Sequence, residues 1–176
     1  MEFLGYALLI LLFVMFFVSI WLKNGLKVLR ITHKPNEIKV GNGKKSALII
    51  YQPTKHDTAT KLTKAVADCL AENGYTVTIN YPSNEINYIL SEYDLIIFGS
   101  GVYLGNFSPV LSDYILRNRF RNKKVLIYTV GLKTDDLTDL NELRVMLDDA
   151  NEVHGIKVSK GQEDKLKEFV VNSIND

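Results

Sequence analysis

The stretch Tyr93–Pro109, YDLIIFGSGVYLGNFSP, constrains the fold more than any other part of the sequence. Its four consecutive apolar residues, 95–98, are followed at once by Gly99. A short run that is apolar on both faces is typical of a strand buried within a parallel sheet. The glycines after it predict a sharp turn at the carboxyl end of the strand. The serine–proline pair at 108–109 then predicts the start of a helix, since serine caps and proline is tolerated at the first position.

Strand and helix signals alternate through residues 46–176. Apolar runs predict strands over residues 46–51, 76–81, 95–98, 123–132 and 153–158. Apolar residues at three- and four-residue spacing predict helices over residues 58–73, 110–120, 137–149 and 162–174. Residues 82–91 are expected to form a connection with a short helix, whose Ile86, Ile89 and Leu90 face inward. This alternation predicts a single α/β domain, in which a five-stranded parallel sheet is covered by helices on both faces.

The amino-terminal segment is a second, separate feature. Residues 3–22 form a run of twenty residues without a charge, and about twenty apolar residues suffice to cross a bilayer. A cleaved signal peptide is the alternative, but it would have a basic start and a shorter apolar run. Here Glu2 precedes the run, and Trp21 and Lys23 mark its end. The sequence therefore favours an uncleaved transmembrane anchor over residues 1–22.

Charge separates the chain into three segments. Residues 23–45 carry seven basic side chains and one acid, whereas residues 46–176 carry fourteen basic and eighteen acidic ones. A basic connector after the span predicts a single-pass protein of the cell membrane whose carboxyl-terminal domain is cytoplasmic. An acidic folded domain argues against nucleic acid as a partner. Cys69 is the only cysteine, which excludes an intrachain disulfide, a zinc knuckle and an iron–sulfur cluster.

Two loops carry the candidate binding residues. The first, QPTKHDTAT at 52–60, brings hydroxyls to a helix amino terminus, where backbone amides favour a phosphate. Simple capping of that helix by Asp57 or Thr58 is the alternative. The second loop, after residue 98, holds Tyr103 beyond the carboxyl end of a strand, where open α/β sheets bind ligands. A tyrosine that only covers the core is the alternative there.

These loops, together with YTVGL at 128–132, resemble the flavodoxin family. Within it the resemblance is to flavodoxin-domain proteins related to menaquinone-dependent protoporphyrinogen oxidase. It implies a five-stranded parallel sheet in the order 2-1-3-4-5, with flavin mononucleotide (FMN) between strands one and three. In the first loop, Gln52 stands where the family usually has a hydroxyl, Lys55 stands in place of a glycine, and the loop is about one residue longer.

The resemblance also implies which residues hold FMN. The phosphate is expected at the first loop, at Thr54, Lys55, His56, Asp57 and Thr58. The isoalloxazine ring is expected to stack on Tyr103, within a turn formed by Ser100, Gly101, Val102, Tyr103, Leu104 and Gly105. Val130 and Gly131 are expected beside it on the loop after strand four. That loop has no aromatic residue before Lys133, so one flavin face is expected to be less covered.

Two functions follow as expectations. One is a membrane-anchored, FMN-binding protein in electron transfer or quinone-linked oxidoreduction, an FMN-dependent oxidoreductase whose partner is a quinone or a redox protein. The other is a flavodoxin-like module that has lost flavin and serves in interaction only. The three histidines are scattered, and the sequence has no paired-carboxylate, Ser-His-Asp or metal-spaced pattern that would identify catalytic residues.

Overall fold

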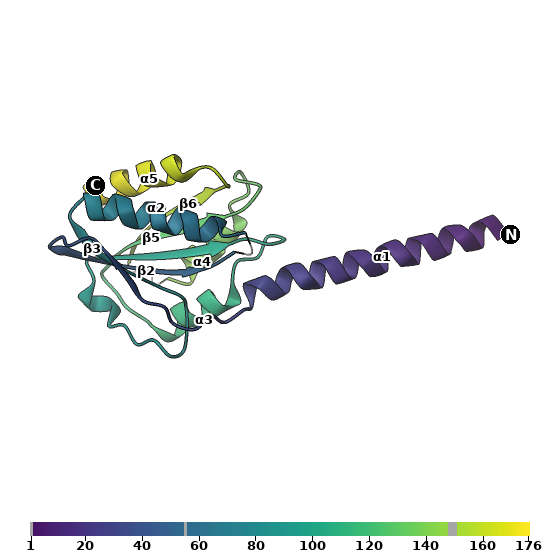
Figure 1. Cartoon of the computed structure of the whole chain (residues 1–176), viewed down its shortest axis with the longest axis horizontal. Helices are drawn as coiled ribbons and strands as arrows, with labels where there is room; N and C mark the ends of the chain where they lie inside the picture. The colour runs from purple at the N-terminus through teal and green to yellow at the C-terminus, as the bar shows by residue number, and fades with distance from the viewer. Residues whose placement is uncertain (1, 55, 148–150) are drawn as a thin grey trace.

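A computed structural model describes residues 2–54, 56–147 and 151–176 of the chain. It consists of a long helix, α1 (Glu2–Leu29), and an α/β domain, and the helix projects from one edge of the domain as a separate rod (Figure 1). Lys55, expected in the phosphate loop, lies outside the described residues.

The domain is built on a six-stranded mixed sheet in the order β1-β3-β2-β4-β5-β6. Neighbouring strands are parallel from β3 to β6, whereas β1 runs antiparallel to β3. The strands are β1 (Ile38–Val40), β2 (Lys45–Gln52), β3 (Tyr75–Asn80), β4 (Leu95–Gly101), β5 (Lys124–Val130) and β6 (Glu152–Val158). The expected α/β fold with a mainly parallel sheet is thus confirmed, but the expected five strands and their order are corrected by β1, which adds a strand at the outer edge.

Strand β1 comes from the segment expected to be an irregular connector. Ile38 pairs with Ile79, and Val40 pairs with Val77. The strand has only three residues, which is too short to show the alternation of apolar and polar residues that identifies a strand. The sequence GNG follows it and favours an irregular segment. Its position covers the edge of β3, which would otherwise present unpaired backbone groups.

Two helices cover each face of the sheet. On one face lie α2 (Thr58–Glu72) and α5 (Glu163–Asn175), side by side in Figure 1, and on the other lie α3 (Pro109–Arg117) and α4 (Thr138–Val145). Each face has its own apolar core, and alternate residues of the central strands supply the two cores. Leu126 and Tyr128 of β5 point toward α2, while Val125 and Ile127 point toward α3 and α4.

The connection at residues 82–91, expected to contain a short helix, is mostly irregular. Only a three-residue 3₁₀ helix, η1 (Leu90–Glu92), forms there. The amide of Glu85 donates to the hydroxyl of Ser83 at 3.1 Å, a local bond that competes with helix formation. Leu90 is buried as expected, but Ile89, expected to face inward, is 59% exposed.

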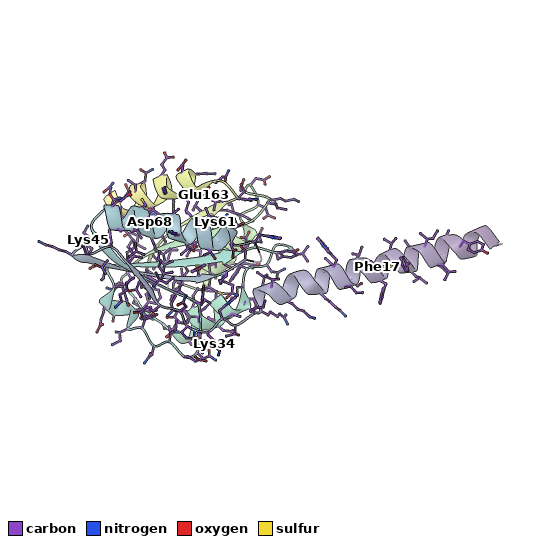
Figure 2. The ribbon with its side chains drawn as sticks, in the orientation of Figure 1. Phe17, Lys34, Lys45, Lys61, Asp68 and Glu163 are labelled. Carbon is purple, nitrogen blue, oxygen red and sulfur yellow. The ribbon has the colours of Figure 1, made fainter. Side chains whose placement is uncertain are left out.

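Helix α1 is long and apolar enough to cross a membrane, by length and composition, with a mean hydropathy of 2.5 within Gly5–Leu29. The described side chains from Gly5 to Trp21 are all exposed, and Figure 2 shows Phe17 projecting from the helix well away from the domain. The helix is buried against the domain in its last turn, where Leu29 is 4% exposed.

Candidate cofactor site at the carboxyl edge of the sheet

The candidate site lies where β2 and β4 end side by side. Gln52, the last residue of β2, is in register with Ser100 of β4. After this point β2 leads into α2 on one face of the sheet, whereas β4 leads into α3 on the other. Connections that leave toward opposite faces open a crevice at the carboxyl edge, where α/β sheets of this type bind ligands.

The glycines of β4 do not form the expected turn. Residues 99–101 continue the strand, paired with β5 through Val130. A side chain at Gly99 would overlap the ring of Tyr128, and one at Gly101 would overlap the Cγ2 methyl of Thr54. Glycine is therefore present for close packing, and the packing at Gly101 brings the loops after β2 and β4 into contact.

The turn itself lies four residues later, in the hairpin Tyr103–Asn106. Tyr103 and Asn106 exchange two backbone hydrogen bonds, at 2.8 and 3.0 Å. The two residues between them have positive φ, 53° at Leu104 and 76° at Gly105, which is the signature of a type I′ turn. The side-chain amide of Asn106 also donates to the carbonyl of Leu104 at 2.9 Å. Tyr103, half-buried, thus sits on a well-ordered turn.

The loop after β2 is arranged differently. The hydroxyl of Thr54 accepts a hydrogen bond from the amide of Ala59 at 3.2 Å, within the first turn of α2. Asp57 occupies the N-cap position in a left-handed conformation, and its side chain makes no capping bond. The alternative of capping by Asp57 or Thr58 is therefore corrected: Thr54 holds this helix end. His56 is exposed.

The loop after β5 forms the other side of the site. The amide of Val102 donates to the carbonyl of Val130 at 2.8 Å, and the amide of Gly131 donates to Val158 at 3.0 Å. Beneath Gly131 lies Lys157, a buried residue of β6. Its ammonium donates to the carbonyl of Asp136 at 2.5 Å and forms an ion pair with the buried carboxylate of Asp139. The base of this loop is therefore held by a buried charge pair, while Leu132, two residues past β5, is fully exposed.

The end of α1 also reaches this edge, which the sequence did not predict. The hydroxyl of Ser108, the N-cap of α3, donates to the carbonyl of Leu29 at 2.7 Å. The side-chain amide of Gln52 donates to the carbonyl of Ile31 at 2.9 Å. Farther up the helix, the ring of Trp21 lies 6.4 Å from that of Tyr103, centroid to centroid. The unusual Gln52 was the one signal in the sequence for this contact.

A row of rings follows the connector past β2 and β3. The ring of His33 lies 5.1 Å from that of Tyr81, which lies 5.4 Å from that of Tyr51. The phenol of Tyr51 donates to Thr60 in α2 at 3.4 Å. Burial lowers the pKa of His33 below its usual value and raises the pKa of Tyr51. His33 is thus held toward its neutral form beside the candidate site.

The arrangement fits a flat ring with a polar edge. Two buried acceptors near the carboxyl ends of β2 and β5, which flank β4, have no hydrogen-bond partner among the described residues: Gln52 Oε1 and Thr129 Oγ1. Such groups normally find one, and a ligand with donors at this edge would satisfy them. At the phosphate side, the threonine hydroxyls and the first turn of α2 fit an anion, whereas the carboxylate of Asp57 does not. Among the described residues no cluster could hold a metal ion.

A cavity of about 310 Å³ lies elsewhere, between residues 88–91 and 117–120. It is lined by η1 with its flanking residues and by the end of α3, none of which belongs to the loops described above. The candidate site rests on the loops at the carboxyl edge instead.

Comparison with known proteins agrees with this geometry. The flavodoxin domain family matches residues 48–169, and the chain belongs to this family. The chain is 32% identical over 85 residues to an uncharacterised protein of Methanocaldococcus jannaschii, a match that covers 48% of this chain and 53% of the relative. The match thus spans about half the length of that relative.

Solved structures show the same fold. Oxidised flavodoxin 1 from Bacillus cereus superposes with a TM-score of 0.61 at 14% identity, covering 74% of this chain and 98% of that one. Rubredoxin oxygen:oxidoreductase from Desulfovibrio gigas gives a TM-score of 0.55 at 18% identity, with 76% of this chain and 36% of that one covered. A flavodoxin domain implies flavin binding and electron transfer, and the residues at the carboxyl edge fit that implication.

Proposed function

We propose that the chain is a membrane-anchored FMN protein that transfers electrons, with a quinone or a redox protein as its partner. Flavin would supply the redox chemistry, because none of the described side chains forms a redox or metal centre of its own. The chain's own part is to bind the cofactor, to orient it and to hold the domain at the membrane.

The observation that carries the proposal is the contact between the two loops at the ends of β2 and β4. Gly101 leaves room for Thr54, and the adjoining hairpin holds Tyr103 at the same edge. A planar ring beside Tyr103 would gain offset stacking, about 0.5–1.5 kcal/mol beyond its burial. Ser100, Val102, Leu104, Gly105, Val130 and Gly131 would line the rest of the ring site.

The phosphate would lie at the first turn of α2, near Thr54 and Thr58. The Thr54 hydroxyl accepts from Ala59, so its hydrogen remains able to donate to a phosphate oxygen. The amides of the first helical turn and the helix dipole favour an anion there. The carboxylate of Asp57 disfavours an anion at this position. Phosphate is therefore expected to bind more weakly here than at a loop without that carboxylate.

Anchoring and orientation extend the proposal. The apolar run of α1 would span the bilayer, and the basic residues after it favour a cytoplasmic domain. A quinone dissolved in the bilayer is the partner that such an anchor suits, in line with the resemblance to proteins related to menaquinone-dependent protoporphyrinogen oxidase. Reaction of a cysteine at position 161 with an impermeant reagent on intact cells, in a Cys69→Ser background, would contradict the orientation.

The full chain, purified in detergent, provides the test. We expect a flavin absorption spectrum after purification or, after stripping, quenching of FMN fluorescence on titration with the protein. Absence of quenching at high micromolar protein would overturn the proposal.

The second candidate function is an anchored interaction module without flavin. Its support is the first loop, where Thr54 is engaged as a helix cap and Asp57 stands beside the phosphate position. This candidate predicts that Tyr103→Ala and Thr54→Ala leave FMN fluorescence unchanged, because the wild-type chain would not quench it either.

A further inference from the structure

We propose that the candidate cofactor site faces the bilayer, with the hairpin Tyr103–Asn106 and the loop after β5 touching the headgroup layer. This inference rests on the proposed membrane anchor and goes beyond it. An anchor alone would only keep the domain near the membrane, whereas here one particular edge of the domain would lie against the lipid.

The depth of the hairpin follows from Trp21. This residue belongs to the uncharged run of α1, and its ring lies 6.4 Å from that of Tyr103. Trp21 and Leu29 are separated by about 12 Å along the helix axis, at about 1.5 Å per residue. The last two turns of α1 therefore run beside the domain, and the hairpin lies level with the end of the membrane-spanning run.

The end of α1 is fixed to the domain by buried groups. The hydroxyl of Ser108 and the amide of Gln52 hold the carbonyls of Leu29 and Ile31, and Ser108 and Gln52 are both fully buried. A buried donor that loses its acceptor costs about 1–3 kcal/mol. The end of the helix is thus joined to the carboxyl edge through buried hydrogen bonds, and Figure 1 shows the helix leaving the domain on that side.

Two exposed leucines in the loops after β4 and β5 point to lipid as the occupant of this edge. Leu104 is 50% exposed and has a φ of 53°, in a turn position where asparagine or glycine is strongly preferred. A side chain other than these pays about 1–2 kcal/mol for a left-handed backbone. Leu132, the second residue after β5, is fully exposed. Both residues lie at the edge from which α1 departs.

The charges around this edge suit an anionic bilayer surface. Lys23, Lys27, Arg30 and Lys34 are exposed along the end of α1 and the connector, and Lys133 follows Leu132. Each basic residue near an anionic surface gains about 1 kcal/mol. The same loop carries two acids, of which Asp136 accepts bonds from Thr138 at its own helix start. Exposed leucines with lysines behind them are typical of an interfacial contact.

The experiment uses the full chain in a Cys69→Ser background, reconstituted into vesicles of phosphatidylcholine with a minor share of phosphatidylglycerol. A single cysteine carrying an environment-sensitive fluorophore replaces Leu104 or Leu132, or Glu72 as the control, since Glu72 ends α2 at the opposite edge of the sheet. Flotation first confirms that the chain is in the membrane. Headgroup-region nitroxide lipids should then quench the probes at 104 and 132 several-fold more than the probe at 72.

The outcomes separate this inference from the proposed function. Equal quenching at 132 and 72 in a chain that floats overturns the inference and leaves the anchor and the flavin site untouched. Probes at 104 and 132 that are shielded from water but not quenched by lipid indicate a protein contact, and also overturn it. A chain that does not float overturns the anchor itself, and this inference with it.

A second pair of variants tests the hairpin without a label on it, with the probe at position 132 in both. Leu104→Asn places the preferred residue in the turn, so the fold should hold, and it should lower lipid quenching at position 132. Val145→Asn is the matched control, because Val145 is 83% exposed and ends α4 at the far edge. Quenching that is unchanged by Leu104→Asn, or lowered equally by both variants, contradicts a lipid contact at the hairpin.

Discussion

The loops after β2 and β4 start from residues that are in register in the sheet, yet they are stabilised by different means. The hairpin Tyr103–Asn106 satisfies its own backbone through two reciprocal bonds, and its shape is set within four residues. The loop at 53–57 is closed by a threonine hydroxyl that caps a helix. The hairpin can thus present a rigid ring, whereas any ligand phosphate must share Thr54 with the helix.

This difference predicts that the two loops contribute differently to the same cofactor. Ring binding should depend on one side chain in a preformed turn and should vary little with the phosphate. Phosphate binding should be distributed over amides and hydroxyls that also stabilise α2, so that single changes there have smaller effects. Four experiments test this contrast.

The largest effect is expected at the ring. Tyr103→Ala removes both stacking and apolar burial, so we expect FMN and riboflavin to bind about ten- to a hundredfold more weakly. Tyr103→Phe, which keeps the ring, is the control and should bind nearly as the wild type does. Titration of flavin fluorescence measures both. Equal affinity for the alanine and phenylalanine variants would show that the ring binds elsewhere.

A somewhat smaller effect is expected where the two loops touch. Gly101→Ala places a methyl group against the Cγ2 of Thr54, and overpacking of this kind costs about 1–3 kcal/mol. We expect about tenfold weaker FMN binding. Thr54→Ser removes that methyl but keeps the hydroxyl bonded to Ala59, so the double variant should recover most of the loss. A double variant as weak as Gly101→Ala alone would mean that the two loops do not meet.

The third experiment isolates the phosphate. Thr54→Ala removes one hydroxyl, worth about 1 kcal/mol net, so FMN should bind about fivefold more weakly. Riboflavin lacks the phosphate and should bind nearly as it does to the wild type. Circular dichroism is the control for loss of the cap on α2, because loss of that cap would lower the affinity for both FMN and riboflavin. A parallel loss of FMN and riboflavin affinity would assign Thr54 to structure alone.

The sequence predicted the parallel strands and the helix starts because their signals are local. The run at 95–98 and the pair at 108–109 fix a buried strand and a capped helix without reference to distant residues. Gly99 and Gly101 predict a turn, but they belong to β4, because glycine marks both turns and sites where a neighbouring side chain fills the space of a Cβ. Only the packing of Tyr128 and Thr54 separates the two cases.

The rest of the site depends on contacts between residues far apart in sequence. The hydrogen bonds from Ser108 and Gln52 to the end of α1 and the residue Ile31 span 79 and 21 residues. The sequence does not indicate which carbonyl either side chain will contact. Strand β1 is too short to carry a period. The sequence therefore predicts an irregular connector, whereas in the structure this segment joins the sheet through β1 and contacts the carboxyl edge through Ile31.

The smallest expected effect concerns that connector and its histidine. Burial against Tyr81 lowers the pKa of His33 below its usual value of 6.5, so the folded protein binds this proton less readily than the unfolded chain does. The contribution of His33 to connector docking is therefore present above pH 6.5 and is lost as the pH falls below it. The pKa of Glu37, which accepts from Tyr88, is also lowered, but that carboxylate titrates below 4.5, outside this window.

Hydrogen–deuterium exchange of residues 30–37, corrected for intrinsic rates, should therefore speed up modestly between about pH 7.5 and 5.5. His33→Gln has no proton to gain in that range and should exchange at a constant corrected rate, which makes it the control. FMN affinity should follow the connector, because Gln52 holds Ile31 at the same edge as the hairpin and the first loop. An equal pH effect in the wild type and in His33→Gln would show that His33 does not cause it. Faster exchange of the connector at low pH with unchanged FMN affinity would show that the two loops bind flavin without help from the connector.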